Sequence, residues 1–104
     1  MKTLQPHEVA RDLEAGGGTL LDVRSEAEFA GLRAEPAINI PLDRLDPALV
    51  RARVDPAKPV YCICASGVRS AMAMAHLERL GLDVVNVAGG TQAWAAAGLP
   101  IARG

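Results

Sequence analysis

Hydrophobic and polar positions divide this chain into short aliphatic runs and longer stretches with helical spacing. Four runs of mostly aliphatic residues stand out, and they lie at Thr19–Val23, Ala37–Ile40, Val60–Cys64 and Val84–Val87. Such runs are typical of strands covered on both faces of a parallel sheet. A shorter strand is expected near Thr3 and Leu4. The pattern therefore predicts five strands, with Val60–Cys64 near the centre.

Helix signals fill the segments between these runs. The first helix has Pro6 in its first turn and glycines after its end, and Ser25 and Glu28 have the spacing of a capping box on a short helix closed by Phe29. Further helices are predicted for 47–54, from the turn at 65–67 to Leu80, and for 91–97. Strands that alternate with helices predict an α/β fold, in which a parallel sheet is flanked by helices.

Composition narrows the classes of function. The 104 residues suit one domain spanning 1–104, and with 50% hydrophobic and 22% charged residues the chain should fold unaided. A net charge of −1 without a basic run argues against nucleic acid as a partner. Because no apolar stretch reaches membrane-spanning length and no signal peptide begins the chain, we expect a cytoplasmic protein without membrane partners.

Cys62 and Cys64 are the two cysteines of the chain. Their spacing is not that of a zinc or thioredoxin site, so we expect no bound metal. A disulfide between two positions so close on one strand would be strained, and a reducing compartment would keep both as thiols. His7 and His76 are expected to be solvated surface residues.

Cys64 occupies the position where open α/β sheets bind ligands, the carboxyl end of a central strand. The loop after it leads into a helix, whose first N–H groups lack intrahelical partners and are able to bind an anion. Arg69 follows five positions later, so that its charge is expected to come back toward the thiolate or the substrate, and Gly67 gives the loop freedom to close. These features would lower the pKa of Cys64 and make it a nucleophile.

Two interpretations of Cys62 remain open. It is either a small packed hydrophobic residue or a resolving thiol that attacks an oxidised or persulfidated Cys64. An acid–base triad is not visible in the sequence. A lone cysteine needs none when its substrate brings a good leaving group and backbone amides stabilise charge.

The segment Cys64-Ala65-Ser66-Gly67-Val68-Arg69-Ser70 resembles the active-site loop of single-domain rhodanese-like sulfurtransferases. In that family a cysteine is followed by two variable residues, Gly, a variable residue and Arg-Ser. Further resemblances, in family order, are Leu21-Asp22-Val23-Arg24 with Glu28-Phe29, Ala37-Ile38-Asn39-Ile40-Pro41-Leu42, and Gly89-Gly90 with Trp94. Together they cover nearly the whole chain.

The resemblance implies a three-layer domain with a five-stranded, mostly parallel sheet flanked by helices. It implies Cys64 as catalytic nucleophile and persulfide carrier, with Asp22, Arg24 and Trp94 as structural residues. The substrate-binding cradle would be formed by Ala65, Ser66, Gly67, Val68, Arg69 and Ser70. The expected reaction needs no cofactor: sulfur passes from thiosulfate or a low-molecular-weight persulfide to cyanide or a thiol.

One segment departs from the family. Where many relatives read Gly-His-Ile-Pro-Gly, this chain has Leu32-Arg33-Ala34-Glu35-Pro36. A loop bordering the site is therefore expected to differ, and with it the preference for donor or acceptor.

Two other classes of function stay in competition with the enzyme. A sulfur-relay or partner-binding module with a protein sulfur acceptor is compatible with the sequence, as is a chain that is part of something larger. Phosphatase or arsenate reductase activity is disfavoured, because loops of that kind place five residues between Cys and Arg, whereas Cys64 and Arg69 enclose four.

Overall fold

The computed structural model describes residues 2–104. Its elements in chain order are β1 (Lys2–Leu4), α1 (Pro6–Glu14), β2 (Thr19–Asp22), α2 (Glu26–Gly31), β3 (Leu32–Ala34), β4 (Ile38–Asn39), the 3₁₀ helix η1 (Leu42–Arg44), α3 (Pro47–Arg53), β5 (Val60–Ile63), α4 (Val68–Glu78), β6 (Val84–Val87), α5 (Gly90–Ala96) and β7 (Ile101–Arg103).

Five strands form one sheet in the order β1-β6-β5-β2-β4, and every neighbouring pair is parallel. β5 lies in the middle, where Cys62 is in register with Leu21 of β2 and Asn86 of β6. The predicted α/β fold with a five-stranded sheet is confirmed.

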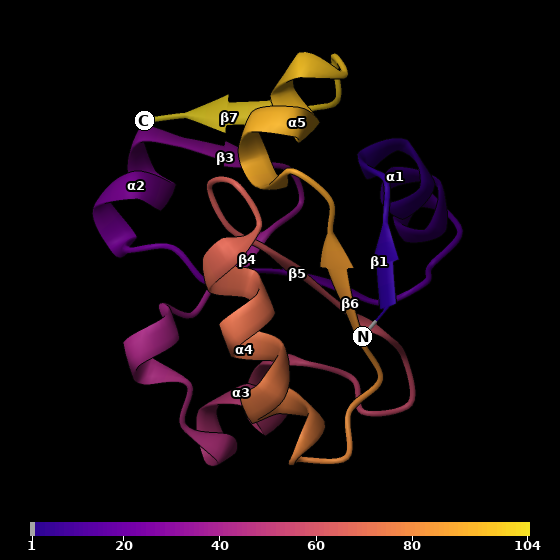
Figure 1. Cartoon of the computed structure of the whole chain (residues 1–104), viewed down its shortest axis with the longest axis vertical. Helices are drawn as coiled ribbons and strands as arrows, with labels where there is room; N and C mark the ends of the chain where they lie inside the picture. Colours follow the sequence, from indigo (N-terminus) through magenta and orange to yellow (C-terminus); the bar gives the residue numbers. More distant parts are fainter. Residues whose placement is uncertain (1) are drawn as a thin grey trace.

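Helices cover both faces of this sheet, which makes three layers (Figure 1). Side chains of successive strand residues point to opposite faces, so Cys62 packs with Met74 and Leu77 of α4, whereas Tyr61 packs with Val9 of α1 and Trp94 of α5. Cys64 is two residues beyond Cys62 and belongs to the α3–α4 side.

The start of α2 has the capping box expected from its sequence. The N–H of Glu28 donates to Ser25 Oγ at 3.2 Å, and the N–H of Ser25 donates to Glu28 Oε1 at 3.1 Å. The helix continues two residues past the predicted end at Phe29, to Gly31. Ser25 and Glu28 thus fix the direction in which α2 leaves β2.

A second, two-stranded sheet was not expected from the sequence. The segment Leu32–Pro36, predicted to be a loop, begins with β3, which pairs antiparallel with β7 so that Leu32 is opposite Arg103. Figure 1 shows the two strands side by side next to α5. Each strand has three residues, too few to give a periodic signal in the sequence. Each forms only because the other, which is far away in the sequence, lies beside it in the fold.

A buried ion pair holds the end of β2. Asp22 is fully buried, and the guanidinium of Arg24 donates from Nε and Nη2 to its carboxylate at 2.8–3.1 Å. Arg24 Nη2 also donates to the carbonyl of Leu32 at 2.5 Å, while the Asn39 amide donates to the carbonyls of Asp22 and Arg24. Together these contacts join β2, β3 and β4.

Across residues 2–104, no helix has both the length and the hydropathy needed to span a membrane.

Replacing Asp22 by Ala should lower the free energy of unfolding by about 3 kcal/mol, because it leaves the Arg24 guanidinium buried without its partner. The matched control is Glu26→Ala, which breaks the exposed Arg44–Glu26 pair and should cost less than about 1 kcal/mol. Urea denaturation of both variants measures the difference, and equal losses would contradict a structural role for the buried pair.

Candidate active site

Cys64 directly follows β5 at the carboxyl edge of the sheet and is 1% exposed. The chain then turns through Ala65 and Ser66 to Gly67, the N-cap of α4, which has φ 106°. This left-handed conformation is open to glycine and costly for other residues. The loop therefore closes over the sulfur before the helix begins.

Backbone N–H groups surround the sulfur. The N–H of Gly67 donates to Cys64 Sγ at 3.0 Å, and Ser70 Oγ lies 3.5 Å from Sγ. Burial raises the pKa of the Cys64 thiol, but hydrogen bonds outweigh it and the pKa is lowered. The donors are the hydroxyl of Ser70 and the N–H groups of Ser70, Gly67 and Ser66.

Helix α5 also holds the loop that follows Cys64, through hydrogen bonds to its backbone. The first N–H groups of α5 donate to loop carbonyls, Thr91 to Cys64 at 2.7 Å and Gln92 to Ala65 at 3.2 Å. Because the N–H and C=O of a planar trans peptide point in opposite directions, anchoring the Ala65 carbonyl on α5 turns the N–H of Ser66 toward the sulfur. The amino terminus of α5 thus shapes the sulfur site without touching the sulfur.

Gly90 makes this approach possible. A Cβ at Gly90 would stand 2.2 Å from the Cys64 carbonyl oxygen and 2.7 Å from that of Ala65, and the residue has φ 61°. In the sequence, Gly89-Gly90 stands out only as part of the family resemblance, so this function was missed.

Ser70 connects the loop to β6. Its single proton has two acceptors within reach, the carbonyl oxygen of Gly67 at 3.1 Å and Asn86 Oδ1, which makes the shorter contact. When Cys64 is a thiol its S–H donates to Ser70 Oγ, and when it is a thiolate the Ser70 proton reaches the sulfur only by leaving these oxygens. Asn86 holds the hydroxyl in place, and nothing in the predicted strand around it marked this role.

Arg69 is paired with Glu28. Its Nη1 donates to Oε1 at 2.6 Å and its Nη2 to Oε2 at 2.7 Å, and both side chains are 36% exposed. Within residues 2–104, hydrogen bonds join this guanidinium to Glu28 and none joins it to Cys64. Its hydrogen bonds lower the pKa of Glu28 to about 2 against the opposing effect of burial. Arg69 is thus hydrogen-bonded to Glu28 and not to Cys64, although the two are close enough for the charge of Cys64 to help raise the pKa of Arg69.

The hollow next to this ion pair has a volume of about 260 Å³ and is lined by Val23, Ser25, Pro41, Leu42, Asp43 and Arg69. It lies at the same edge of the sheet as Cys64, since the N–H of Val23 donates to the carbonyl of Ile63.

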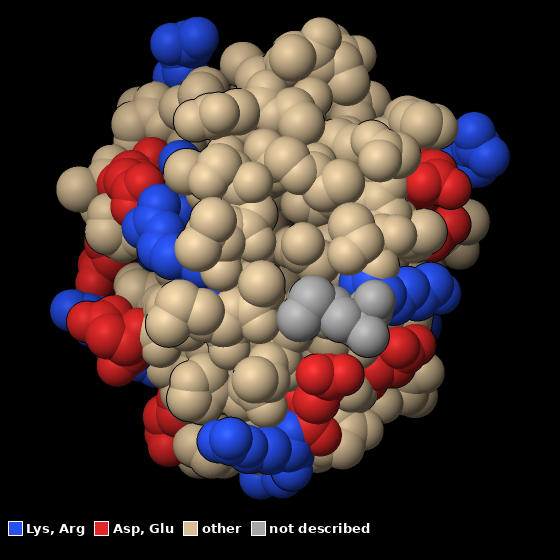
Figure 2. All heavy atoms as spheres, viewed as in Figure 1, with Lys and Arg blue, Asp and Glu red and all other residues tan. Residues whose placement is uncertain are grey.

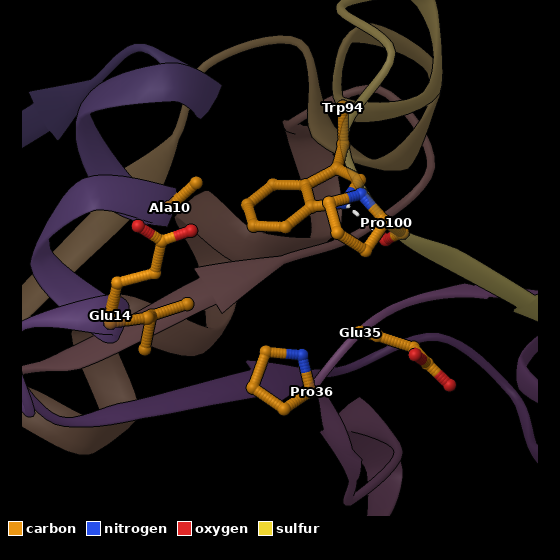
Figure 3. A pocket seen from close by; sticks show the side chains of 7 residues that line it. Ala10, Glu14, Glu35, Pro36, Trp94 and Pro100 are labelled. Carbon is orange, nitrogen blue, oxygen red and sulfur yellow. Dashed lines mark hydrogen bonds between the residues drawn. The ribbon is translucent and has the colours of Figure 1, made fainter.

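A larger hollow of about 330 Å³ opens elsewhere, between α1, Pro36 and the indole of Trp94 (Figure 3). It belongs to the α1–α5 side, away from Cys64.

Known proteins share this arrangement. The family model for the rhodanese-like domain matches residues 5–97. The chain belongs to the rhodanese-like domain family. The thiosulfate sulfurtransferase GlpE of Actinobacillus pleuropneumoniae is 32% identical over 99 residues, which are 94% of this chain and 90% of that protein.

Solved structures agree with the family. A rhodanese-related protein from Thermoplasma volcanium superposes with a TM-score of 0.84 at 32% identity, over 98% of both chains. Another relative, the uncharacterised protein slr1261 of Synechocystis, is 30% identical, and this chain spans 56% of its length.

The remaining cysteine of this rhodanese-like domain differs from Cys64. Cys62 is fully buried within β5, and desolvation, aided by the charge of Cys64, raises its pKa to about 12. His7 and His76 are exposed. Within residues 2–104, no three His, Cys, Asp or Glu side chains are grouped as metal ligands.

Cys64 should react with iodoacetamide at pH 6.5 before Cys62 does. Its lowered pKa leaves more thiolate at that pH than the ~8.5 of a free thiol allows, whereas Cys62 stays protonated. Peptide mapping after limited alkylation locates the label, and the pH dependence of the rate gives the pKa. First reaction at Cys62, or a rate that follows pH as for a free thiol, would contradict the cradle.

Gly90→Ala should disturb the sulfur site, because its Cβ collides with two loop carbonyls. Gly81→Ala is the control: Gly81 has φ 80° but open space where the Cβ would lie, so both variants incur the left-handed cost of about 1 kcal/mol. Only Gly90→Ala should lose further stability and lower the alkylation rate of Cys64 at pH 6.5, by about tenfold. Similar alkylation rates in the two variants would contradict the role of α5.

Proposed function

We propose that this chain is a sulfurtransferase that carries sulfur as a persulfide on Cys64. Donors would be thiosulfate or a low-molecular-weight persulfide, and acceptors would be cyanide, a small thiol or a protein thiol. The observation that carries the proposal is a buried sulfur that accepts a hydrogen bond from the N–H of Gly67 at 3.0 Å and whose pKa is lowered. Membership of the rhodanese-like family and the sulfurtransferase names of relatives support the same reaction.

The proposed reaction has two displacements. The Cys64 thiolate attacks the outer sulfur of thiosulfate, a sulfur–sulfur bond to Cys64 forms, and the original sulfur–sulfur bond breaks so that sulfite leaves with the electron pair. Cyanide or a thiolate then attacks the outer sulfur, and the Cys64 thiolate leaves. Atoms and electrons balance without a cofactor.

The loop has a clear task in both steps. Negative charge lies on Cys64 Sγ before the first displacement and after the second, and on the outer sulfur of the persulfide between them. The amides of residues 65–70 and the Ser70 hydroxyl would stabilise each of these anions without a metal. Both cysteines are free, and a reducing cytoplasm would keep them so.

Incubation with thiosulfate should add the mass of one sulfur atom to the protein, and peptide mapping should place it on Cys64. Cys64→Ser should lose both this adduct and sulfur transfer to cyanide, because a serine hydroxyl is too weakly acidic to take the sulfur. Cys62→Ala should keep most turnover and lose about 1 kcal/mol of stability. Persistent transfer in Cys64→Ser would refute the mechanism, and lost turnover in a stable Cys62→Ala would make Cys62 a resolving thiol.

A further inference from the structure

We infer that Glu28 sets the donor preference of this site: by neutralising Arg69, it favours donors with a single negative charge over the dianion thiosulfate. The inference rests on the proposed function and adds a residue that determines its substrate class. It starts from the fact that Arg69 is the only charged residue of the loop 64–70.

The Glu28 carboxylate of this ion pair is hydrogen-bonded both to Arg69 and to Ser25. Two parallel hydrogen bonds of 2.6 and 2.7 Å join guanidinium and carboxylate, the geometry that binds arginine most firmly. Glu28 is also tied to the start of α2, where Ser25 donates to it from its N–H and from its hydroxyl at 3.1 and 3.0 Å. Because Ser25 holds the Glu28 carboxylate in place, this carboxylate stays beside Arg69 as long as the capping box is intact.

Two other arginines near this edge are also paired with carboxylates, whereas Arg33 stacks on the Phe29 ring of α2 and, among residues 2–104, forms no ion pair. Arg44 is paired with Glu26 in an exposed ion pair, and Arg24 is buried against Asp22. Asp43 lines the hollow beside Arg69, and among residues 2–104 it forms no ion pair. Figure 2 shows acidic and basic side chains next to one another along the edge that carries α2, with no basic patch there.

The consequence for donors follows from charge. Backbone amides around Cys64 stabilise one anionic sulfur, but thiosulfate brings a second charge that must lie outside the cradle. There it meets a guanidinium whose charge is already cancelled by Glu28, and Asp43 adds further repulsion. A singly charged donor with the same reacting sulfur avoids this repulsion.

Thiosulfate and methanethiosulfonate provide the test, because they differ by one negative charge and a methyl group. In both cases the Cys64 thiolate takes the outer sulfur, and either sulfite or methanesulfinate leaves with the electron pair. The measured quantity is the ratio of kcat/KM for thiosulfate to kcat/KM for methanethiosulfonate, with cyanide as acceptor.

Glu28→Gln should raise this ratio about tenfold, because it frees the charge of Arg69, whereas glutamine at this position still completes a capping box. Glu26→Gln is the matched control on the same helix, and it should change the ratio less than about twofold because Arg44 lies outside the loop. Arg69→Gln should move the ratio in the opposite direction, since it leaves Glu28 unpaired.

The outcomes separate the inference from the function. If sulfur transfer persists and neither Glu28→Gln nor Arg69→Gln changes the ratio, or if both lower the two activities in parallel, the pair is only structural and the inference is wrong. If Glu28→Gln fails to fold, the Arg69→Gln ratio alone decides. If the wild-type protein takes sulfur from neither donor, the proposed function itself fails.

Discussion

The sulfur site depends on the orientation of three peptide planes between Cys64 and Gly67. The amino termini of two helices meet at this short loop: N–H groups of α5 donate to its carbonyls, and the N–H of Gly67, the N-cap of α4, donates to the sulfur. Peptide planarity couples the two sides, because a carbonyl held on α5 sends the following N–H the other way. The distance between α5 and the loop, which a side chain at Gly90 would not permit, therefore controls the electrostatics at Cys64.

Charge at this site is stabilised by dipoles more than by ions. The arginine closest in sequence to Cys64 has its charge balanced by Glu28, and the strong donors to the sulfur are amides and a hydroxyl. Preorganised dipoles of this kind stabilise one anion at a fixed place with little reorganisation. A sulfur atom that is anionic in turn on Cys64 and on the persulfide matches such a site.

Local sequence signals predicted most of the fold and part of the site. The strand at Val60–Cys64, the capping box at Ser25 and the loop after Cys64 follow from patterns within a few residues, and the structure has all three. What sequence reasoning missed depends on distant partners. β3 exists through β7, Ser70 is held by Asn86, and Arg69 is bound by Glu28, 41 positions away.

The two cysteines show that reactivity here belongs to the position and not to the residue type. Both lie on the α4 side of the sheet and both are buried, yet burial raises the pKa of Cys62 to about 12 whereas the pKa of Cys64 is lowered. Around Cys62 the backbone N–H groups are used by the ladders with β2 and β6. Two residues later the ladder has ended, and the first N–H groups of α4 have no carbonyl within the helix to bind. The end of β5 is thus the first point on this strand where a buried sulfur can find hydrogen-bond donors. An anionic sulfur is therefore stabilised at Cys64 but not at Cys62, two residues earlier.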